Sequence, residues 1–165
     1  MKKLITLVFT MIIALSSVCY ANEAKEQVSI VYFNGSNLNK NDVNKIIYKP
    51  VLDMLSSRFN VIEDSVHKDK LVAQGLSDIA SIDKSDLLNT FKDDQQTSYI
   101  VLIQIDPCLG PKNMAGNLKI VDLKQQNYLF NGRILRDTTW GSPYAVLKKI
   151  AKENESIIQE KLINI

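Results

Sequence analysis

The sequence contains few of the residues that most often carry catalysis or bind metals. It has one histidine, His67, and two cysteines, Cys19 and Cys108, among 165 residues. A lone histidine followed by Lys68 and Asp69 in a polar segment is more typical of a solvated surface position than of a catalytic one. A zinc site at His67 would need several carboxylates, and no suitable spacing is present. The composition therefore predicts no catalytic residue, no metal and no cofactor. A Cys108–His67 nucleophile pair would require the two side chains to meet in space.

Glycine-rich phosphate loops and converging carboxylates are missing as well. Asn34–Ser36 follows an apolar run and precedes a helical pattern, which is the context of a phosphate loop, but it contains a single glycine. The acidic pairs at 63–64 and 93–94 are adjacent residues, so their side chains need not point at one substrate. Ordinary turns account for all three segments.

Only one long apolar run exists, and it lies at the amino terminus. Leu4–Leu15 follows two lysines and precedes Cys19-Tyr20-Ala21, which predicts a secretory signal peptide over residues 1–21, cleaved after Ala21. Lipidation at Cys19 is an alternative, but it disagrees with the β-branched Val18 before it. An uncleaved anchor is the other alternative, and the run is short for one. We expect export by the general secretory route to the periplasm or the medium, with no stable membrane insertion after cleavage.

Removal of the signal changes the charge and the cysteine count. Residues 1–21 contain two lysines and no acid, so the remaining 144 residues carry 18 basic and 18 acidic side chains. A surface with no net charge gives no electrostatic footprint for nucleic acid or anionic lipid. Cys108 becomes the only cysteine. An unpaired thiol in an oxidising compartment is either buried or forms an intermolecular disulfide.

Hydrophobic periodicity divides the rest into a disordered lead-in at 22–27 and a single domain at 28–165. The predicted order along the chain is β-α-β-α-α-β-β-β-α. It indicates an α/β (α+β) two-layer sandwich with a mixed sheet of about five strands. The predicted strands are 28–33, 59–62, 99–105, 117–123 and 128–135, and the predicted helices are 43–55, 66–74, one from 85 and one from 143.

Three local features are predicted within these elements. Pro50 lies inside the first helix, so a kink or break is expected near Lys49. Asn131-Gly132 interrupts the last strand and suggests a β-bulge. Ser142 is placed to cap the final helix, with Pro143 at its first position.

Candidate functional residues occur in two places. Asp106 and Cys108 follow the most apolar strand, where α/β folds often place functional groups, although Asp106 before a proline is also a common turn. A crevice near Asn34 and Asp106 could hold a small ligand. Near the end of the chain, aromatic and arginine side chains gather in the sequence and suggest a partner-binding surface, or else the packing of the sheet against the last helix. They are Tyr128, Arg133, Arg136, Trp140 and Tyr144.

The element order resembles small envelope domains of the CsgG and TolB amino-terminal type. The resemblance rests on five segments and spans most of residues 28–163, although the glycine that usually follows the hairpin aspartate is missing after Asp122. The segments are Val28–Phe33, the helix through Leu55, Phe59–Asp64, Tyr99–Ile105 and Leu118–Leu123. It implies a noncatalytic envelope role: contact with a partner protein, oligomeric assembly or regulation of a partner.

We therefore expect an exported protein-binding or assembly module of the bacterial cell envelope that is not an enzyme. Its partner would be another envelope protein or a second copy of the chain. The alternatives are a small extracytoplasmic enzyme or a ligand binder that uses Asp106 and Cys108 at the carboxyl end of the central strand.

Overall fold

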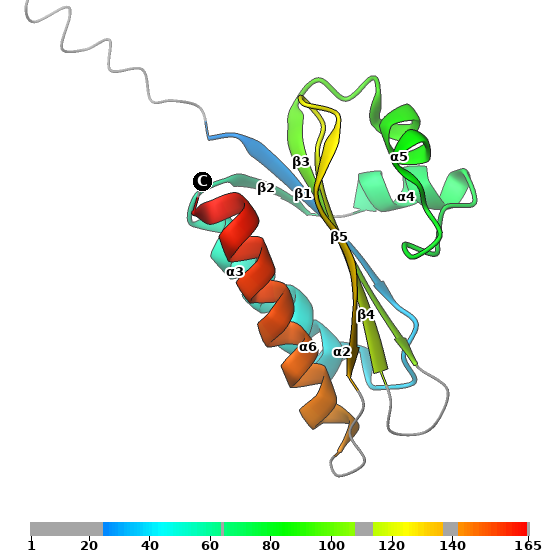
Figure 1. Cartoon of the computed structure of the whole chain (residues 1–165), viewed down its shortest axis with the longest axis vertical. Coiled ribbons are helices and arrows are strands. Elements are labelled where there is room, and N and C mark those ends of the chain that lie inside the picture. The colour runs from blue at the N-terminus through cyan, green and yellow to red at the C-terminus, as the bar shows by residue number, and fades with distance from the viewer. Residues whose placement is uncertain (1–24, 64, 108–113, 137–141, 165) are drawn as a thin grey trace, which may run out of the picture.

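A computed structural model describes residues 25–63, 65–107, 114–136 and 142–164 (Figure 1). The predicted signal peptide lies outside these residues, as do Cys108 and Trp140. The elements are β1 (Gln27–Asn34), α2 (Lys40–Val43), the π-helical turn η1 (Asn44–Tyr48), α3 (Lys49–Ser56), β2 (Asn60–Glu63), α4 (Ser65–Ala73), α5 (Lys84–Phe91), β3 (Thr97–Pro107), β4 (Met114–Asp122), β5 (Asn127–Arg136), α6 (Pro143–Ile158) and a second π-helical turn, η2 (Gln159–Ile163).

The strands form one mixed sheet in the order β2-β1-β3-β4-β5. β1, β2 and β3 are parallel, whereas β4 and β5 continue the sheet as antiparallel strands. The predicted fold class and element order are confirmed. β3 lies in the middle because its near-continuous apolar run can be covered on both faces.

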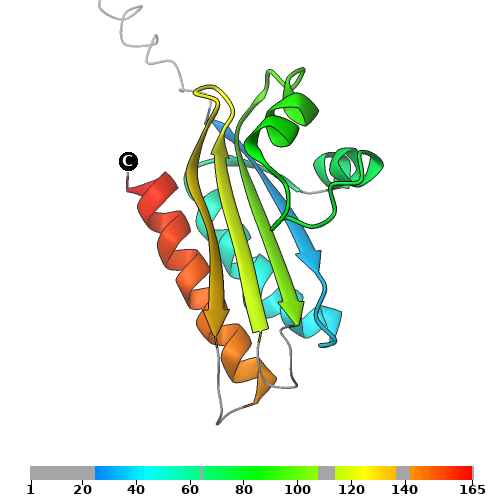
Figure 2. The same cartoon turned by 45° about the vertical axis from the view of Figure 1, so that its right-hand side comes forward.

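The helices lie on opposite faces of the sheet because of the direction in which the chain crosses it. The first crossover leads from β1 outward to β2, and the second returns past β1 to β3. Right-handed crossovers in opposite directions place their helices on opposite faces. Accordingly α2, α3 and α6 pack on one face, while α4 and α5 cover the upper part of the other (Figures 1 and 2). This partial third layer is an addition to the predicted sandwich.

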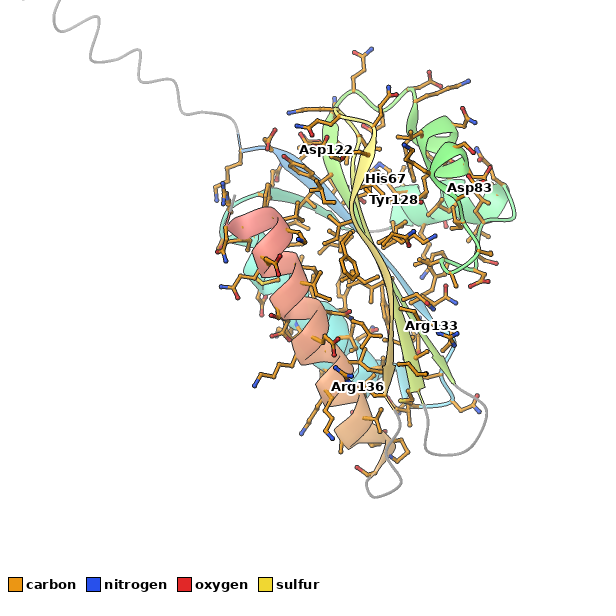
Figure 3. The ribbon with its side chains drawn as sticks, viewed as in Figure 1. His67, Asp83, Asp122, Tyr128, Arg133 and Arg136 are labelled. Carbon is orange, nitrogen blue, oxygen red and sulfur yellow. The ribbon has the colours of Figure 1, made fainter. Side chains whose placement is uncertain are left out.

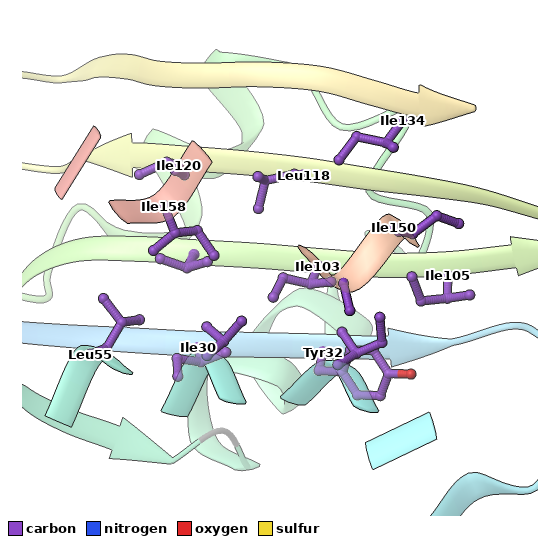
Figure 4. Close-up of a cluster of buried hydrophobic side chains, with 14 of the residues drawn as sticks. Ile30, Tyr32, Leu55, Ile103, Ile105, Leu118, Ile120, Ile134, Ile150 and Ile158 are labelled. Carbon is purple, nitrogen blue, oxygen red and sulfur yellow. The ribbon is translucent and has the colours of Figure 1, made fainter. Parts of the chain in front are cut away.

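Each face of the sheet has its own hydrophobic core. The larger core joins alternate side chains of the central strands to Leu55 of α3 and to Ile150 and Ile158 of α6 (Figure 4). The smaller core joins the intervening side chains, such as Val31 and Leu102, to α4 and α5. Successive residues of a strand point to opposite faces, and this alternation assigns the buried apolar residues of a strand to one core or the other.

The irregularity predicted at Pro50 is confirmed. The Lys49 amide donates to the Asn44 carbonyl, five residues back, and α3 begins at Lys49 with Pro50 in its first turn. Pro50 has no amide hydrogen for a regular helical bond, so the wider turn before it keeps the helix continuous.

The position predicted for the bulge in β5 is wrong by two residues. Ile120 pairs with Phe130, but the next residue, Val121, pairs with Tyr128, so Leu129 is the extra residue. Gly132 has a different role: a β-carbon there would lie 2.7 Å from the ring of Phe130. The glycine leaves room for that ring.

The final helix begins as predicted. The Ser142 hydroxyl accepts from the Ala145 amide at 3.3 Å, and Pro143 is the first helical residue. The buried face of α6 contains one polar residue, Asn154, whose exposed fraction is 0%. Neither of its side-chain polar atoms has a hydrogen-bond partner among the described residues.

Replacing Asn154 by leucine is expected to stabilise the fold by about 1 to 2 kcal/mol, because a buried amide without partners carries its full desolvation cost. Urea denaturation of N154L and the wild type measures the difference. Ser156→Leu, on the exposed side of the same helix, is the matched control and should leave the free energy of unfolding almost unchanged. A loss of stability in N154L would contradict this account of the site.

Candidate functional site

A crevice of about 510 Å³ lies at the carboxyl ends of β1 and β3. The chain leaves these neighbouring strands in opposite directions, and such switch points are where open α/β sheets bind ligands. Asn34 and Asp106, the pair singled out in the sequence, both line it. Other lining residues come from β1, from the turn after it, from α4 and from β3: Phe33, Ser36, Lys68 and Gln104.

Asp106 is held as a fixed hydrogen-bond acceptor on one wall of the crevice. Gln104 Nε2 donates to both carboxylate oxygens, at 2.7 and 2.9 Å, and Asn117 Nδ2 donates to one of them at 3.0 Å. Gln104 Oε1 in turn accepts from the Ile79 amide. A β-carbon on Gly35 would lie 2.9 Å from the Asp106 carboxylate, so the turn after β1 packs directly against it. The network fixes the carboxylate and also joins the α4–α5 loop to the sheet.

Lys68 brings a positive charge to the other wall. Its Nζ donates to the Tyr32 carbonyl at 2.6 Å and lies 4.8 Å from the centre of the Phe33 ring. A cation over an aromatic face is electrostatically favourable. Lys40, which is exposed, also lines the crevice. The lining thus combines two lysines with one carboxylate.

Tyr32, the residue whose carbonyl accepts from Lys68, carries a buried hydroxyl. Tyr32 is 6% exposed and packs in the larger core (Figure 4), yet its hydroxyl has no hydrogen-bond partner among the described residues. Burial raises the pKa of this phenol, so it is a neutral donor at ordinary pH. Tyr32 also lines the crevice.

The interpretation of His67 as a solvated surface residue is wrong. His67 is 4% exposed and lies between α4 and the sheet (Figure 3). Its Nδ1 is 2.8 Å from the Ser29 hydroxyl of β1, and its Nε2 is 2.6 Å from Asp94 Oδ2. Leu71, one helical turn further on, is fully buried, and this spacing could have placed His67 on the buried face of α4.

The Ser29–His67–Asp94 chain is a structural connection, not a nucleophilic triad. Ser29 is 0% exposed inside the sheet, so no substrate can reach its hydroxyl. Burial alone would raise the pKa of Asp94, but hydrogen bonds from His67, Thr97 and Gln96 outweigh it and lower the pKa to about 2. The charged carboxylate therefore connects α4 to the segment that begins β3.

The residues predicted as a partner-binding surface lie on both faces of the sheet (Figure 3). Tyr128 packs on the α4–α5 side, where Lys119 Nζ lies 5.8 Å from its ring. Arg133 alternates with the buried Ile134 and so shares that side. Arg136 and Tyr144 lie on the α6 side. Arg136 pairs with Glu153, and the Tyr144 hydroxyl donates to Asp42 at 3.1 Å. The four described residues do not form one patch.

Neither a metal centre nor a membrane-spanning helix is found in the described part of the chain. No cluster of three or more histidine, cysteine, aspartate or glutamate side chains there could hold an ion. None of the helices there combines the length and the apolar character needed to cross a membrane.

Compared with protein families and with curated protein sequences, the chain gives no match. Its fold is similar to several solved structures at low identity. TolB from Acinetobacter baumannii has 19% identity and a TM-score of 0.49 over 85% of this chain, which spans only 29% of TolB. Lipoprotein GNA1162 from Neisseria meningitidis has 13% identity and a TM-score of 0.45, covering 82% of this chain and 98% of that one.

A third similar structure is the PelC dodecamer from Paraburkholderia phytofirmans, with 10% identity, a TM-score of 0.42, and coverage of 84% of this chain and 87% of that one. TolB, one of the two proteins named in the resemblance, is thus among the similar structures. At these identities the likeness concerns the fold alone.

Proposed function

We propose that this chain is an exported, noncatalytic protein-binding domain of the bacterial cell envelope that binds its partner at the crevice at the carboxyl ends of β1 and β3. In this proposal residues 1–21 direct export to the periplasm or the medium and are then removed. The observation that carries the proposal is the open crevice at the topological switch point, where the fixed carboxylate of Asp106 and the ammonium group of Lys68 both belong to lining residues.

The chemistry of the crevice supports binding over catalysis. Three polar residues of the crevice lining, Asp106, Asn34 and Lys68, are each engaged in a structural contact. Asp106 accepts from two amides, Asn34 Oδ1 accepts from the Ser36 hydroxyl at 2.6 Å, and Lys68 donates to the main chain. The Ser36 hydroxyl therefore donates to an amide oxygen and not to a base that could activate it. A fixed set of donors and acceptors suits recognition of a partner.

Site-specific photocrosslinking in the bacterium that makes the protein tests the proposal. Benzoylphenylalanine in place of Phe33 puts the reactive group in the crevice with little change in shape. We expect irradiation to give one discrete covalent complex with a second protein, identifiable by mass spectrometry. The matched control places the same group at Lys152, an exposed residue of α6 on the opposite face. Complexes from neither position, or the same complexes from both, would overturn the proposal.

A further inference from the structure

β1 has an open edge beside the crevice. β2 pairs with β1 only from Gln27 to Ile30, whereas β1 continues to Asn34. No described strand therefore lies beside residues 31–34 on the β2 side, although β3 pairs with all of them on the other side. Figure 2 shows this second half of β1 (blue) at the margin of the lower part of the sheet.

The main-chain groups that face this edge follow from the alternation along β1. The Glu26 carbonyl accepts from Asn60 on the β2 side, and the Gly35 amide donates to Ile105 on the β3 side. Main-chain groups of successive residues point to alternate edges of a strand, so the even-numbered Tyr32 and Asn34 face the open edge. The bond from Lys68 Nζ to the Tyr32 carbonyl agrees with this assignment.

Open strand edges in proteins are either blocked or used to bind another strand. Here Lys68 Nζ donates a hydrogen bond to the Tyr32 carbonyl. An added strand would donate one of its own amide hydrogens to the same carbonyl. The flexible stem of Lys68 would let the ammonium group leave this carbonyl when an amide replaces it. The released ammonium group gains its strongest partner if the added segment supplies a carboxylate, because a hydrogen bond between two charged groups is stronger than one to a carbonyl. Lys40 adds a second positive charge to the same lining.

We infer that the second half of β1 binds an extended peptide segment that carries an acidic residue. This inference rests on the proposed function and specifies the conformation and the charge of the segment that the partner contributes. The segment continues the sheet where β2 stops, its amide hydrogen bonds to the Tyr32 carbonyl, and its carboxylate pairs with the released Lys68. Phe33, on the α4–α5 side of the strand, offers apolar contact to a neighbouring side chain of the segment.

The probe for this inference is a phage-displayed library of random linear nine-residue peptides, selected on the exported form of the protein. We expect the selected peptides to be rich in β-branched residues and to share an aspartate or glutamate. Replacing that acid by its amide should lower the affinity of the synthetic peptide at least tenfold, as measured by calorimetry. Lys68→Gln in the protein should lower the affinity of the unchanged peptide by as much. Lys70→Gln on the same helix, outside the crevice lining, is the matched control and should bind as the wild type does.

A second measurement uses the wild-type protein and so does not depend on the folding of a variant. Methylation of single backbone amides of the peptide should abolish binding at alternate positions only, because only alternate amides of a strand face β1. A library without binders, binding indifferent to Lys68→Gln, or equal tolerance at every methylated position each overturns the inference. If the Phe33 crosslink to a partner nevertheless forms, the proposed function stands and only the strand mode fails. If neither the crosslink nor peptide binding is observed, the proposed function and the strand mode both fail.

Discussion

Replacing Gly116 by alanine is expected to destabilise the fold by about 2 to 3 kcal/mol, because the helix α6 packs directly on this residue. Gly116 lies in β4, and a β-carbon there would be 2.6 Å from Ile150 Cγ2 on the helix and 3.6 Å from Ile105 Cδ1 on the neighbouring strand. Both neighbours are fully buried, so neither can move into solvent. Urea denaturation of G116A and the wild type measures the loss.

The matched partner for this test is Ile150→Leu, which keeps the volume of the side chain and removes its β-branch. On its own it should cost less than about 1.5 kcal/mol. Combined with G116A it should recover at least about 1 kcal/mol, since residues in contact show coupling energies of that size. If the double variant loses as much as the sum of the single ones, the approach of α6 to Gly116 is not the cause.

Replacing Asp94 by asparagine is expected to cost about 2 kcal/mol at pH 7. The folded protein lowers the pKa of Asp94 from its ordinary value of 3.8 to about 2 through His67, Thr97 and Gln96. One pKa unit corresponds to about 1.4 kcal/mol. A carboxyl group whose pKa is lower in the folded state stabilises at pH values above its unfolded pKa, and this stabilisation is lost as the pH falls through the folded value.

The contribution of Asp94 should therefore be complete above about pH 4 and should fall steadily towards pH 2. Urea midpoints of D94N and the wild type at pH 7, 5, 4 and 3 should converge as the solution becomes more acidic. Asp93→Asn, the exposed neighbour, is the matched control and should change stability little at any of these values. A gap between D94N and the wild type that stays constant from pH 7 to pH 3 would show that the charge of Asp94 is not what stabilises the fold.

The sequence alone predicted the order of the helices and strands, and it also predicted the location of Asp106 in the crevice. Apolar runs predicted all five strands, and the most apolar run did become the central strand. Asp106 was placed because the carboxyl end of a buried strand is a fixed location in the fold. Lys68 and Tyr32 could not be predicted there, since their contact depends on how α4 packs on β1. Gln104 carried a signal that was missed: it is the only polar residue within an otherwise apolar stretch of β3, which indicates a buried hydrogen-bond network.

The aromatic and arginine residues show why closeness in sequence did not predict a common surface. Arg133 and Arg136 are three residues apart on one strand, so their side chains point to opposite faces of the sheet. The extra residue Leu129 reverses the alternation before Phe130, and this places Tyr128 on the face opposite to Phe130. A bulge of this kind depends on pairing with β4 and leaves no clear pattern in the strand itself.

The strand order also divides the sheet into two parts, which differ in how far apart along the chain their paired residues lie. β3, β4 and β5 are joined by short connections, so their pairing brings together residues that are near one another in the chain. The pairing of β1 with β3 joins Gln27 to Thr97, about 70 residues apart, and such pairing carries the larger loop-closure entropy. The crevice lies on this long-range seam. Separation of β1 from β3 therefore dismantles the crevice while the local three-stranded meander keeps its own hydrogen bonds.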